Sequence, residues 1–392
     1  MGTPFYAYDL DAFRERIRAF EAELGDVPHL TCYAVKANDA LALLEVVASE
    51  ELGADVVSGG ELAKARKAGI AAVKIAFSGV GKRADEIRAA IDMGIRSLNV
   101  ETIEELDDIA AAARALGRTA PVSVRLNPGV EGGGHEYLAT GRAGSKFGLE
   151  RDQAAEALHR AAADDALEPV GISFHVGSQL LEIEPVLVAA ERAAELWSEL
   201  AEAGIRLRDF DAGGGLGIPY DGGPPPDFRA YARALADIAS RLDATLILEP
   251  GRHLVGPIGT FVTRVLHVKK AGDKTIVVCD GGMNDLLRPV LYGAEHPVTL
   301  LDENKRDERE QAPVDLVGPL CEGSDFFALA RTLPIPRRGD LIAIGLAGAY
   351  GRVMSSTYNA RPLCAEVVLE QGGWRISRER GTYDDLVRNE RA

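Results

Sequence analysis

A lysine at the end of the first apolar run of this chain could act as a covalent catalyst. The run reads Tyr33-Ala34-Val35-Lys36-Ala37-Asn38. An amine among apolar residues is easier to deprotonate, and a neutral amine can form a Schiff base with an aldehyde. Lys36 is therefore a candidate anchor for pyridoxal 5'-phosphate (PLP), although a lysine at a strand end is more often a solvated tip.

Other short motifs carry groups that could complete such a site. Glu249-Pro250-Gly251-Arg252 combines a carboxylate with a guanidinium, and Cys321-Glu322 places a thiol beside a carboxylate. The run Gly213-Gly214-Gly215-Leu216-Gly217 offers bare backbone N–H groups that suit a phosphate, and a simple tight turn explains it equally well. Neither this run nor Ser78-Gly79-Val80-Gly81-Lys82-Arg83 has the spacing of a nucleotide-binding motif.

Composition limits the classes of protein that fit. The chain has 392 residues, of which 46% are hydrophobic, so it can bury a large core and should form two domains, or one large domain and an appendage. Its net charge of -16 argues against a nucleic-acid partner. The four cysteines are far apart, so neither a disulfide framework nor a metal site is indicated. Without a long apolar run or a signal peptide at its start, we expect a cytoplasmic protein and no membrane partner.

The first two-thirds of the chain alternates short β-branched runs with amphipathic helical patterns. Thr102 with Glu105, and Ser58 with Glu61, predict capping boxes at two helix starts. Eight such units favour an α/β fold of the TIM (β/α)8 barrel type, with a doubly wound open sheet as the alternative. The strand-like segments lie near 30–36, 54–58, 73–77, 97–101, 121–127, 169–175, 208–213 and 244–249.

Polar residues follow the expected strands at or just beyond their C-terminal ends. In a barrel these ends converge on one face, where catalysis occurs. The pattern therefore predicts one site at that face. Its residues are Lys36, Asp55, Asn99-Val100-Glu101, Asn127, His175, Gly213-Gly214-Gly215 and Glu249.

After Pro250 the helical periodicity fades, and strand-like runs predict a second, β-rich barrel or sandwich domain. We expect a barrel over 27–255 and a β domain formed by 1–26 with 256–392, in which Phe5-Tyr6-Ala7-Tyr8 adds a strand. Two stretches, 221–226 and 302–310, are typical of solvated loops. The β-rich runs lie at 258–269, 274–280, 312–318, 340–347 and 362–377.

Seven motifs together resemble the fold-type III pyridoxal-phosphate decarboxylases, and within them the diaminopimelate decarboxylase family. Thr140-Gly141 and Ser145-Lys146-Phe147-Gly148 also resemble that branch. The match extends over nearly the whole chain, in the family's order. The motifs are Tyr33-Ala34-Val35-Lys36-Ala37-Asn38, His175-Val176-Gly177-Ser178-Gln179, Gly213-Gly214-Gly215-Leu216-Gly217, Glu249-Pro250-Gly251-Arg252, Gly281-Gly282-Met283-Asn284-Asp285, Cys321-Glu322 and Tyr358-Asn359-Ala360-Arg361-Pro362.

The resemblance implies a PLP site. Lys36 would hold the cofactor, and Glu249 would keep the pyridine nitrogen protonated and so deepen the electron sink. His175 would stack on the ring, whereas without the other motifs it would be read as a satisfied core histidine. Hydroxyl and backbone donors would bind the phosphate. The full implied cofactor set is Lys36, Asp55, His175, Ser178, Gly214, Gly215, Glu249, Gly251, Arg252 and Tyr358.

The resemblance also implies an amino-acid substrate with a second amino-acid head. Arg252, Arg288 and Tyr292 would bind its distal carboxylate, with Tyr358 also at the substrate, and Glu322 would bind its distal ammonium. Cys321 would be a catalytic proton donor, although a free cysteine is more often simply buried. The family commonly has Cys-Glu-Ser where this chain has Cys321-Glu322-Gly323.

The implied activity is decarboxylation of meso-2,6-diaminopimelate to L-lysine and CO2 by a homodimer with shared active sites. One alternative is a related decarboxylase of ornithine, lysine, arginine or carboxynorspermidine; ornithine enzymes typically have Asp where this chain has Glu322. A racemase of the alanine type would pair the ring nitrogen with an arginine, unlike Glu249. A non-enzymatic PLP carrier protein would lack the β domain.

Overall fold

The computed structural model describes residues 2–130, 141, 144–301 and 309–391. Thr140 of the expected family signature and most of the expected loop at 302–310 lie outside these residues. The other expected loop, 221–226, contains no helix or strand.

The chain divides into two compact units. The barrel unit consists of Arg14–Ile218 and Pro225–His253, and the β unit consists of Met1–Phe13, Pro219–Pro224 and Leu254–Ala392. This division is based on the compactness of the units. The domain boundaries expected from the sequence, 27–255 and 1–26 with 256–392, stay a prediction.

Parallel strands in the barrel unit close on themselves in sequence order, β2 to β9. Closure is made by β2 and β9, where His29 is paired with Leu246. The TIM barrel prediction is confirmed. The open-sheet alternative is wrong because in an open sheet β2 and β9 would not pair with each other. The strands are β2 (His29–Ala34), β3 (Gly53–Val56), β4 (Ile75–Phe77), β5 (Ser97–Val100), β6 (Ala120–Leu126), β7 (Leu167–Phe174), β8 (Asp209–Asp211) and β9 (Thr245–Leu248).

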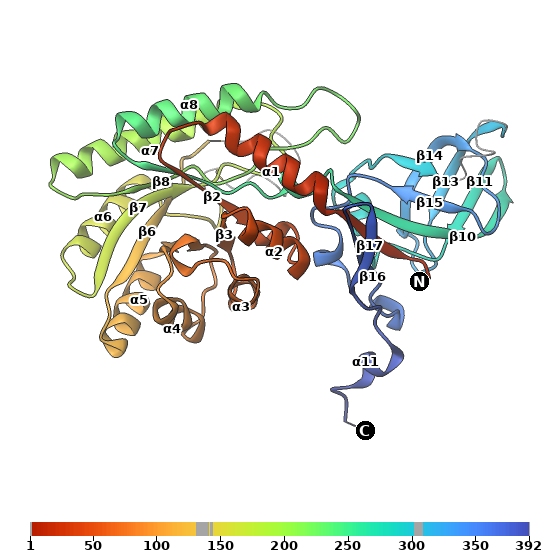
Figure 1. Ribbon diagram of the computed structural model, residues 1–392, viewed down its shortest axis with the longest axis horizontal. Helices are drawn as coiled ribbons and strands as arrows, with labels where there is room; N and C mark the ends of the chain where they lie inside the picture. Colours follow the sequence, from red (N-terminus) through yellow and green to blue (C-terminus); the bar gives the residue numbers. More distant parts are fainter. Residues whose placement is uncertain (1, 131–140, 142–143, 302–308, 392) are drawn as a thin grey trace. The chain divides into compact units, whose positions relative to one another are not determined.

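Helices outside these strands shield the barrel from solvent (Figure 1). Strands β3, β4 and β5 are buried along their whole length, including their polar residues Asp55, Ser97 and Asn99. The helices of this region are α1 (Leu10–Leu24), α2 (Leu41–Ser49), α3 (Gly59–Lys67), α4 (Ala84–Met93), α5 (Ile103–Leu116), α6 (Arg151–Ala162), α7 (Glu184–Glu202) and α8 (Phe228–Arg241), with 3-10 turns η1 (Val35–Ala37) and η2 (Ala72–Lys74).

The two predicted capping boxes are half correct. Thr102 Oγ1 accepts from the Glu105 N–H at 3.1 Å, as an N-cap does, but the Glu105 carboxylate accepts from the Glu101 N–H instead of from Thr102. At α3, Ser58 caps Glu61 in the same way. Each carboxylate thus accepts a hydrogen bond from the backbone N–H of the residue before the cap, and this bond ties the helix start to the preceding strand end.

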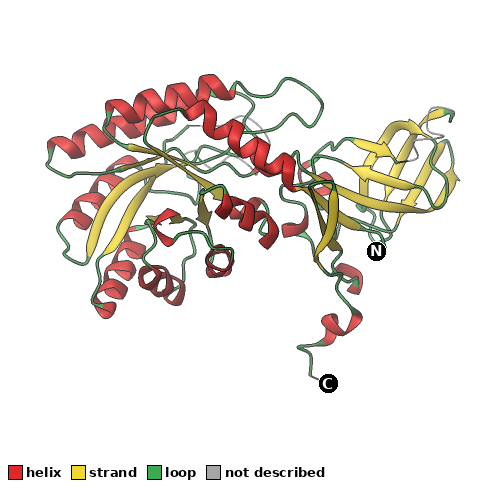
Figure 2. Ribbon diagram, in the orientation of Figure 1, coloured by secondary structure: helices red, strands yellow, loops and turns green. Residues whose placement is uncertain are grey.

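The β unit contains a mixed sheet in which β1 lies between β10 and β16. Figure 2 draws the strands of both units in yellow. The expected N-terminal strand is confirmed. Strands β12 and β14 were not predicted. The strands are β1 (Phe5–Asp9), β10 (Gly259–Ala271), β11 (Lys274–Cys279), β12 (Val298–Leu300), β13 (Gln311–Val317), β14 (Phe326–Pro334), β15 (Leu341–Ile344), β16 (Ala365–Glu370) and β17 (Gly373–Arg378).

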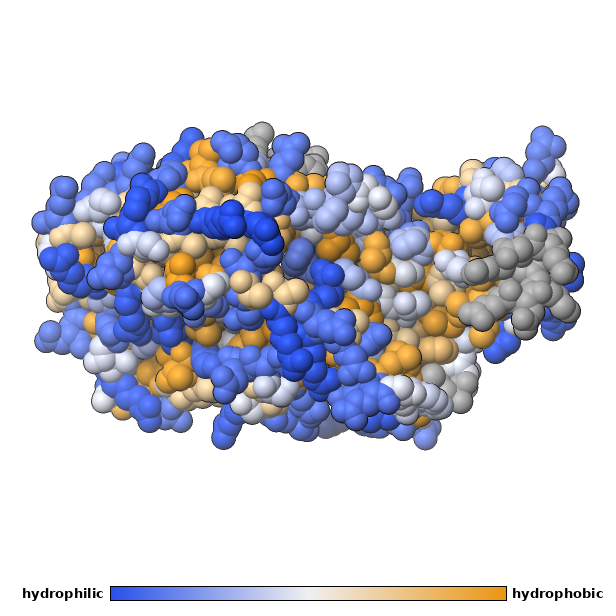
Figure 3. All heavy atoms as spheres, turned by 45° about the horizontal axis from the view of Figure 1, so that its top comes forward, coloured by the Kyte–Doolittle hydropathy of each residue, from blue (hydrophilic) through white to orange (hydrophobic). Residues whose placement is uncertain are grey.

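The described residues also include short helical segments: α9 (Arg252–Val255), α10 (Arg288–Tyr292), η5 (Arg352–Met354), η6 (Tyr358–Ala360) and α11 (Tyr383–Val387). The face drawn in Figure 3 mixes hydrophilic and hydrophobic side chains. Among the described residues, no helix is long and apolar enough to cross a membrane.

Candidate active site

The amine of Lys36 lies at the C-terminal end of the barrel strands, beside a buried carboxylate. Strand β2 ends at Ala34, and the turn η1 carries Lys36 beyond the strand. Its Nζ is 2.5 Å from Asp55 Oδ2, near the end of β3. Asp55 is fully buried, whereas 35% of the Lys36 side chain is exposed. The ion pair therefore holds an amine that remains accessible to a ligand.

Two more buried carboxyl groups lie at neighbouring strand ends. Asp211 is the last residue of β8, and Glu249 directly follows β9. Burial raises the pKa of Glu249 well above its usual value, and the charges of Asp211 and Asp55 raise it further. Burial also raises the pKa of Asp211, which shares a hydrogen bond with Glu249. Glu249 Oε1 is buried without a hydrogen-bond partner among the described residues, so a polar ligand group would satisfy it.

The imidazole of His175 is neutral. Burial lowers its pKa well below the usual value, and the nearby Arg125 and Lys36 cations lower it further. His175 Nδ1 accepts a hydrogen bond from the Gly214 N–H at 3.2 Å. The hydrogen of the neutral ring is therefore on Nε2, and the contact fixes the ring against the glycine turn.

The glycine turn lies close to neighbouring strand ends. A Cβ added at Gly214 would be 2.1 Å from the Glu249 carbonyl oxygen, and one at Gly215 would be 2.2 Å from that of Gly177. Gly215 also has φ +110°, which L side chains rarely adopt. The sequence therefore needs glycine here for packing, and the lack of a side chain leaves the backbone of Gly215 approachable by a phosphate. The Gly213 and Gly214 N–H groups already donate to Asp211 and His175.

A buried cation lies in the same part of the barrel unit. Arg252 is only 4% exposed, and its Nη2 donates to Ser178 Oγ at 3.0 Å. Gly251 precedes it and packs closely: an added Cβ would be 2.9 Å from Ala37 Cβ. A guanidinium, a hydroxyl and bare backbone amides form a donor set suited to an anion.

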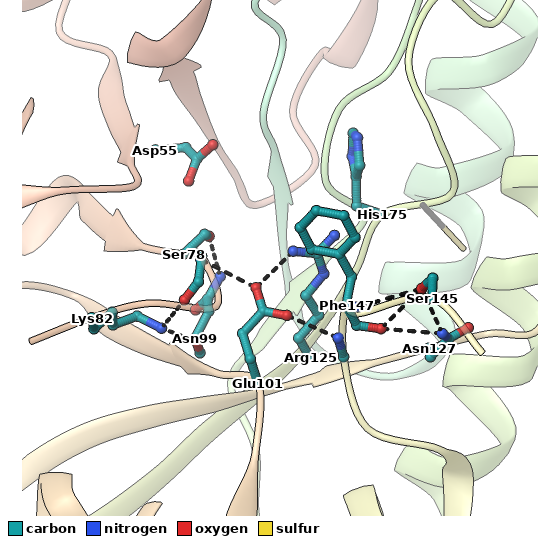
Figure 4. Close-up of polar contacts among 12 residues, drawn as sticks. Asp55, Ser78, Lys82, Asn99, Glu101, Arg125, Asn127, Ser145, Phe147 and His175 are labelled. Carbon is teal, nitrogen blue, oxygen red and sulfur yellow. Dashed lines mark hydrogen bonds and ion pairs between the residues drawn. The ribbon is translucent and has the colours of Figure 1, made fainter. Parts of the chain in front are cut away.

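A polar network, shown in Figure 4, supports this face of the barrel. Glu101 Oε1 accepts from Arg125 Nη1 at 2.7 Å, and Glu101 Oε2 accepts from the Gly148 N–H at 2.8 Å. Lys82 is fully buried and donates to the Asn99 carbonyl oxygen at 2.7 Å. Figure 4 places Asp55 and His175 on the same side of the network. The loops after β4, β5 and β6 are thus tied together below the candidate site.

These residues fit PLP on their chemistry. An accessible amine, a buried carboxyl oxygen without a partner, a neutral imidazole and an anion-binding donor set match an aldehyde, a pyridine nitrogen, an aromatic ring and a phosphate respectively. The barrel unit contains all these groups.

The β unit brings together a second group of expected residues. Cys321 is exposed, and its N–H donates to Asn359 Oδ1 at 2.8 Å. Tyr358 Oη is 3.5 Å from Glu322 Oε2. A Cβ at Gly323 would meet nothing within 4 Å, so the family's serine would fit in this position without displacing a neighbour.

Helix α10 carries Arg288 and Tyr292, the other expected substrate residues of the β unit. Arg288 is 3% exposed, and its guanidinium carbon is 5.8 Å from the Tyr292 ring centre. The Tyr220 ring centre is 4.9 Å away. The Arg288 Nε–H donates to His296 Nε2 at 3.3 Å.

The expected site residues therefore form separate groups within the two units. Sequence reasoning missed Asp211, Arg125, Tyr220 and His296. Asp211 could have been found, because it is polar and ends a strand just before the glycine turn. The expected cofactor residues in the barrel unit are Lys36, Asp55, His175, Ser178, Gly214, Gly215, Glu249, Gly251 and Arg252; Tyr358 lies in the β unit with Arg288, Tyr292, Cys321 and Glu322.

A family model and curated relatives both match this chain, and they agree on its family. Residues 10–256 match the family described as "Pyridoxal-dependent decarboxylase, pyridoxal binding domain". The diaminopimelate decarboxylase of Helicobacter pylori is 43% identical over 99% of this chain and 95% of the relative. The chain belongs to the diaminopimelate decarboxylase family.

Solved structures agree with this family. The crystal structure of diaminopimelate decarboxylase from Helicobacter pylori complexed with L-lysine has a TM-score of 0.96 and 42% identity, covering 100% of this chain and 97% of that chain. A more distant pyridoxal-dependent fold is that of SrLDC in complex with PLP and cadaverine, with a TM-score of 0.82, 27% identity and coverage of 94% of this chain and 91% of that chain.

Proposed function

We propose that this protein is a PLP-dependent carboxy-lyase that converts meso-2,6-diaminopimelate to L-lysine and CO2. The observation that carries the proposal is the 43% identity to a diaminopimelate decarboxylase over 99% of the chain. In the reaction a carboxylate leaves as CO2, its bonding electrons stay on the α-carbon, and a proton takes its place. Such a step in lysine biosynthesis suits a cytoplasmic enzyme.

The barrel residues would hold and tune the cofactor. Bound PLP supplies an electron sink for the pair left on the α-carbon. Lys36 would be its covalent anchor, and the Glu249 carboxyl would hydrogen-bond the ring nitrogen. Neutral His175 would pack on the ring without adding a competing positive charge. The phosphate would be bound by Ser178, Gly215, Gly251 and Tyr358. Gly214 and Arg252 would also contribute to the cofactor site, and Asp55 would orient the Lys36 amine.

The β-unit residues would bind the substrate and return a proton. The Cys321 thiol would protonate the α-carbon, and the Glu322 carboxylate would pair with the distal ammonium. Arg288 would bind the distal carboxylate with help from Arg252, Tyr292 and Tyr358. Burial makes Arg288 a strong candidate, because His296 and the Tyr220 and Tyr292 rings surround a guanidinium whose donors match a substrate carboxylate.

We further propose a two-fold homodimer in which Cys321 and Glu322 of each subunit serve the barrel of the other. The Cys321 loop supports this arrangement because its thiol and carboxylate are exposed instead of packed within their own unit. A closed two-fold dimer would then contain two equivalent shared sites.

A related decarboxylase is the second candidate, favoured by the likeness to SrLDC with its bound cadaverine at 27% identity. The test is a CO2-release assay on meso-diaminopimelate, lysine, ornithine, arginine and carboxynorspermidine side by side. We expect turnover of diaminopimelate far above the rest. Faster turnover of any other substrate would reject the proposed specificity, and no CO2 from any of them with PLP bound would favour a carrier protein.

Arg288 offers a sharper test of distal recognition. L-Lysine, as the product, keeps the distal carboxylate, whereas cadaverine has none. We expect Arg288→Ala to lower kcat/KM for diaminopimelate by roughly 100-fold, since a lost charge-assisted bond costs about 2–4 kcal/mol. The inhibition constant of L-lysine should rise strongly and that of cadaverine little. Arg331→Ala, which removes a partly exposed arginine of strand β14 paired with Glu295, is the control. Equal weakening of both inhibitors by Arg288→Ala would indicate a structural arginine.

A further inference from the structure

The guanidinium of Arg288 is held from two directions inside the β unit. Its Nε–H donates to His296 Nε2 at 3.3 Å. The Tyr220 ring centre lies 4.9 Å from the guanidinium carbon, and the Tyr220 and His296 rings meet edge to face at 5.0 Å and 70°. Neither Tyr220 nor His296 belongs to α10, so the orientation of Arg288 depends on other segments of the chain.

The hydrogen bonds define the state of His296. Its Nδ1 is 2.9 Å from the carbonyl oxygen of Gly345, which can only accept, so Nδ1 carries a hydrogen. An arginine has only donors, so Nε2 must be the acceptor for Arg288. His296 is thus a neutral imidazole with its hydrogen on Nδ1. This form bridges a fixed backbone carbonyl and the arginine.

The backbone fixes His296 in its turn. The Gly345 N–H donates to the Pro297 carbonyl oxygen at 2.9 Å. The neighbouring residues Val298 and Ile344 are paired where β12 and β15 run antiparallel. His296 is only 1% exposed, so its ring has little space to rotate. The sheet therefore determines where the acceptor for Arg288 lies.

We propose that His296, supported by the Tyr220 ring, is a positioning residue that orients the Arg288 guanidinium for the distal carboxylate of the substrate. The inference rests on the proposed function of Arg288. With Nε bound to His296 and one face against Tyr220, the plane of the guanidinium is set before substrate binds. Preorganisation of this kind favours ligands with a distal carboxylate over those without it, which makes His296 specificity-determining.

The test compares variants that remove or keep the acceptor. His296→Leu removes it, whereas His296→Gln offers an oxygen acceptor within a similar reach. For His296→Leu we expect about a tenfold rise in KM for meso-diaminopimelate and in the inhibition constant of L-lysine, as fits loss of a hydrogen bond to a charged group. The inhibition constant of cadaverine and kcat should stay within about threefold, and His296→Gln should recover most of the loss.

Two controls separate positioning from general damage. His267→Leu replaces an exposed histidine on β10 of the same unit and should change none of these constants. Tyr220→Phe keeps the ring and should behave as wild type, whereas Tyr220→Leu should resemble His296→Leu. Thermal unfolding of each holoenzyme verifies folding. If His296→Leu weakens lysine and cadaverine equally, or weakens neither, the proposal is wrong.

A double-mutant cycle distinguishes this proposal from the function on which it rests. In an Arg288→Ala background, His296→Leu should have no further effect, because its partner is gone. A full additional effect would overturn the positioning role while leaving the assignment of Arg288 intact. If Arg288→Ala itself fails to discriminate lysine from cadaverine, the assignment of Arg288 falls, and the role of His296 falls with it.

Discussion

Three buried carboxyl groups crowd the C-terminal end of the barrel, and their charges oppose one another. Asp55 and Asp211 both raise the pKa of Glu249, while Lys36 and Arg125 lower it. Besides its proposed role as the anchor, Lys36 limits through its charge the proton affinity of the carboxyl proposed to face the cofactor ring. Removal of the Lys36 charge should therefore raise the pKa of Glu249.

Lys36→Ala is the most direct test of the anchor. We expect the purified variant to lose decarboxylase activity and any cofactor linkage reducible by borohydride, since no amine would remain at that position. Mass spectrometry after reduction measures the linkage. Lys64→Ala removes a partly exposed lysine of α3 that is paired with Asp39, and this variant should retain the reducible linkage. A reducible linkage in folded Lys36→Ala protein would contradict the assignment.

The sequence could predict residues that follow strands, such as Lys36 and Glu249, because chain position alone places a strand end. Arg125 lies inside strand β6, and its role depends on where barrel closure brings Glu101 and His175. His296 was missed for a similar reason: its partner Gly345 is 49 residues away, joined through strand pairing that includes the unpredicted β12.

At the scale of elements, the glycine turn after β8 couples the backbone proposed to bind the cofactor phosphate to Glu249. The Glu249 N–H donates to the Gly213 carbonyl oxygen at 2.7 Å, while Asp211 Oδ1 accepts from the Gly213 N–H at 2.9 Å. The turn and the carboxyl thus cannot move independently. Damage to the turn should weaken both phosphate binding and the position of Glu249.

Gly214→Ala tests this coupling. The added Cβ would come within 2.1 Å of the Glu249 carbonyl oxygen, so β9 or the turn must shift. We expect a loss of about 1–3 kcal/mol in the free energy of unfolding, as for overpacking, together with weaker PLP binding in a titration. Gly81→Ala is the matched control, since its Cβ would meet nothing within 4 Å. Wild-type PLP affinity in Gly214→Ala would argue against the coupling.

The contact of α1, α8 and α9 should give a pH-dependent stability. The His253 ring lies 6.1 Å from Phe20 and 5.6 Å from Phe228, and burial and the Arg16 charge lower its pKa to about 4. The unfolded value is about 6.5. The stabilising contribution is therefore complete above about pH 6.5 and is lost as the pH falls towards 4, because only the unfolded chain gains the proton readily.

Urea unfolding across pH 4 to 7 checks this sign. His253 should account for up to about 3 kcal/mol of the loss at acid pH, and His253→Gln should show a correspondingly shallower pH dependence. His159→Gln, on the exposed side of α6, should retain the wild-type slope. An unchanged slope in His253→Gln would mean that other groups control acid unfolding.

Most barrel strands were predictable because short, largely apolar runs alternate with helical patterns; β8, which reads Asp-Phe-Asp, was found from its place in that alternation. Strand β14 was missed since Phe326–Pro334 alternates poorly between buried and exposed residues and contains a positive-φ residue, Ala330. Strand β12 has only three residues, too few for a periodic signal. Both are recognisable only from the partners that pair with them.

At the scale of the whole molecule, the proposed chemistry needs both units, but the covalent anchor and the proton donor lie in different ones. A homodimer with shared sites makes a quantitative prediction from this division. Lys36→Ala damages the barrel contribution to a site, whereas Cys321→Ala damages the β contribution. Each variant alone damages both sites of its own homodimer.

Mixing the two inactive variants should restore activity. In a hybrid dimer, one site carries both substitutions and the other carries neither. Random exchange of equal amounts gives about half hybrid dimers, each with one intact site, so activity should recover to roughly a quarter of the wild-type value. Differently tagged chains, purified through both tags, would isolate the hybrid and raise the expected value to roughly half. If tagged hybrids form and their activity stays at the level of the separate variants, each subunit contains its own complete site and the shared-site proposal is wrong.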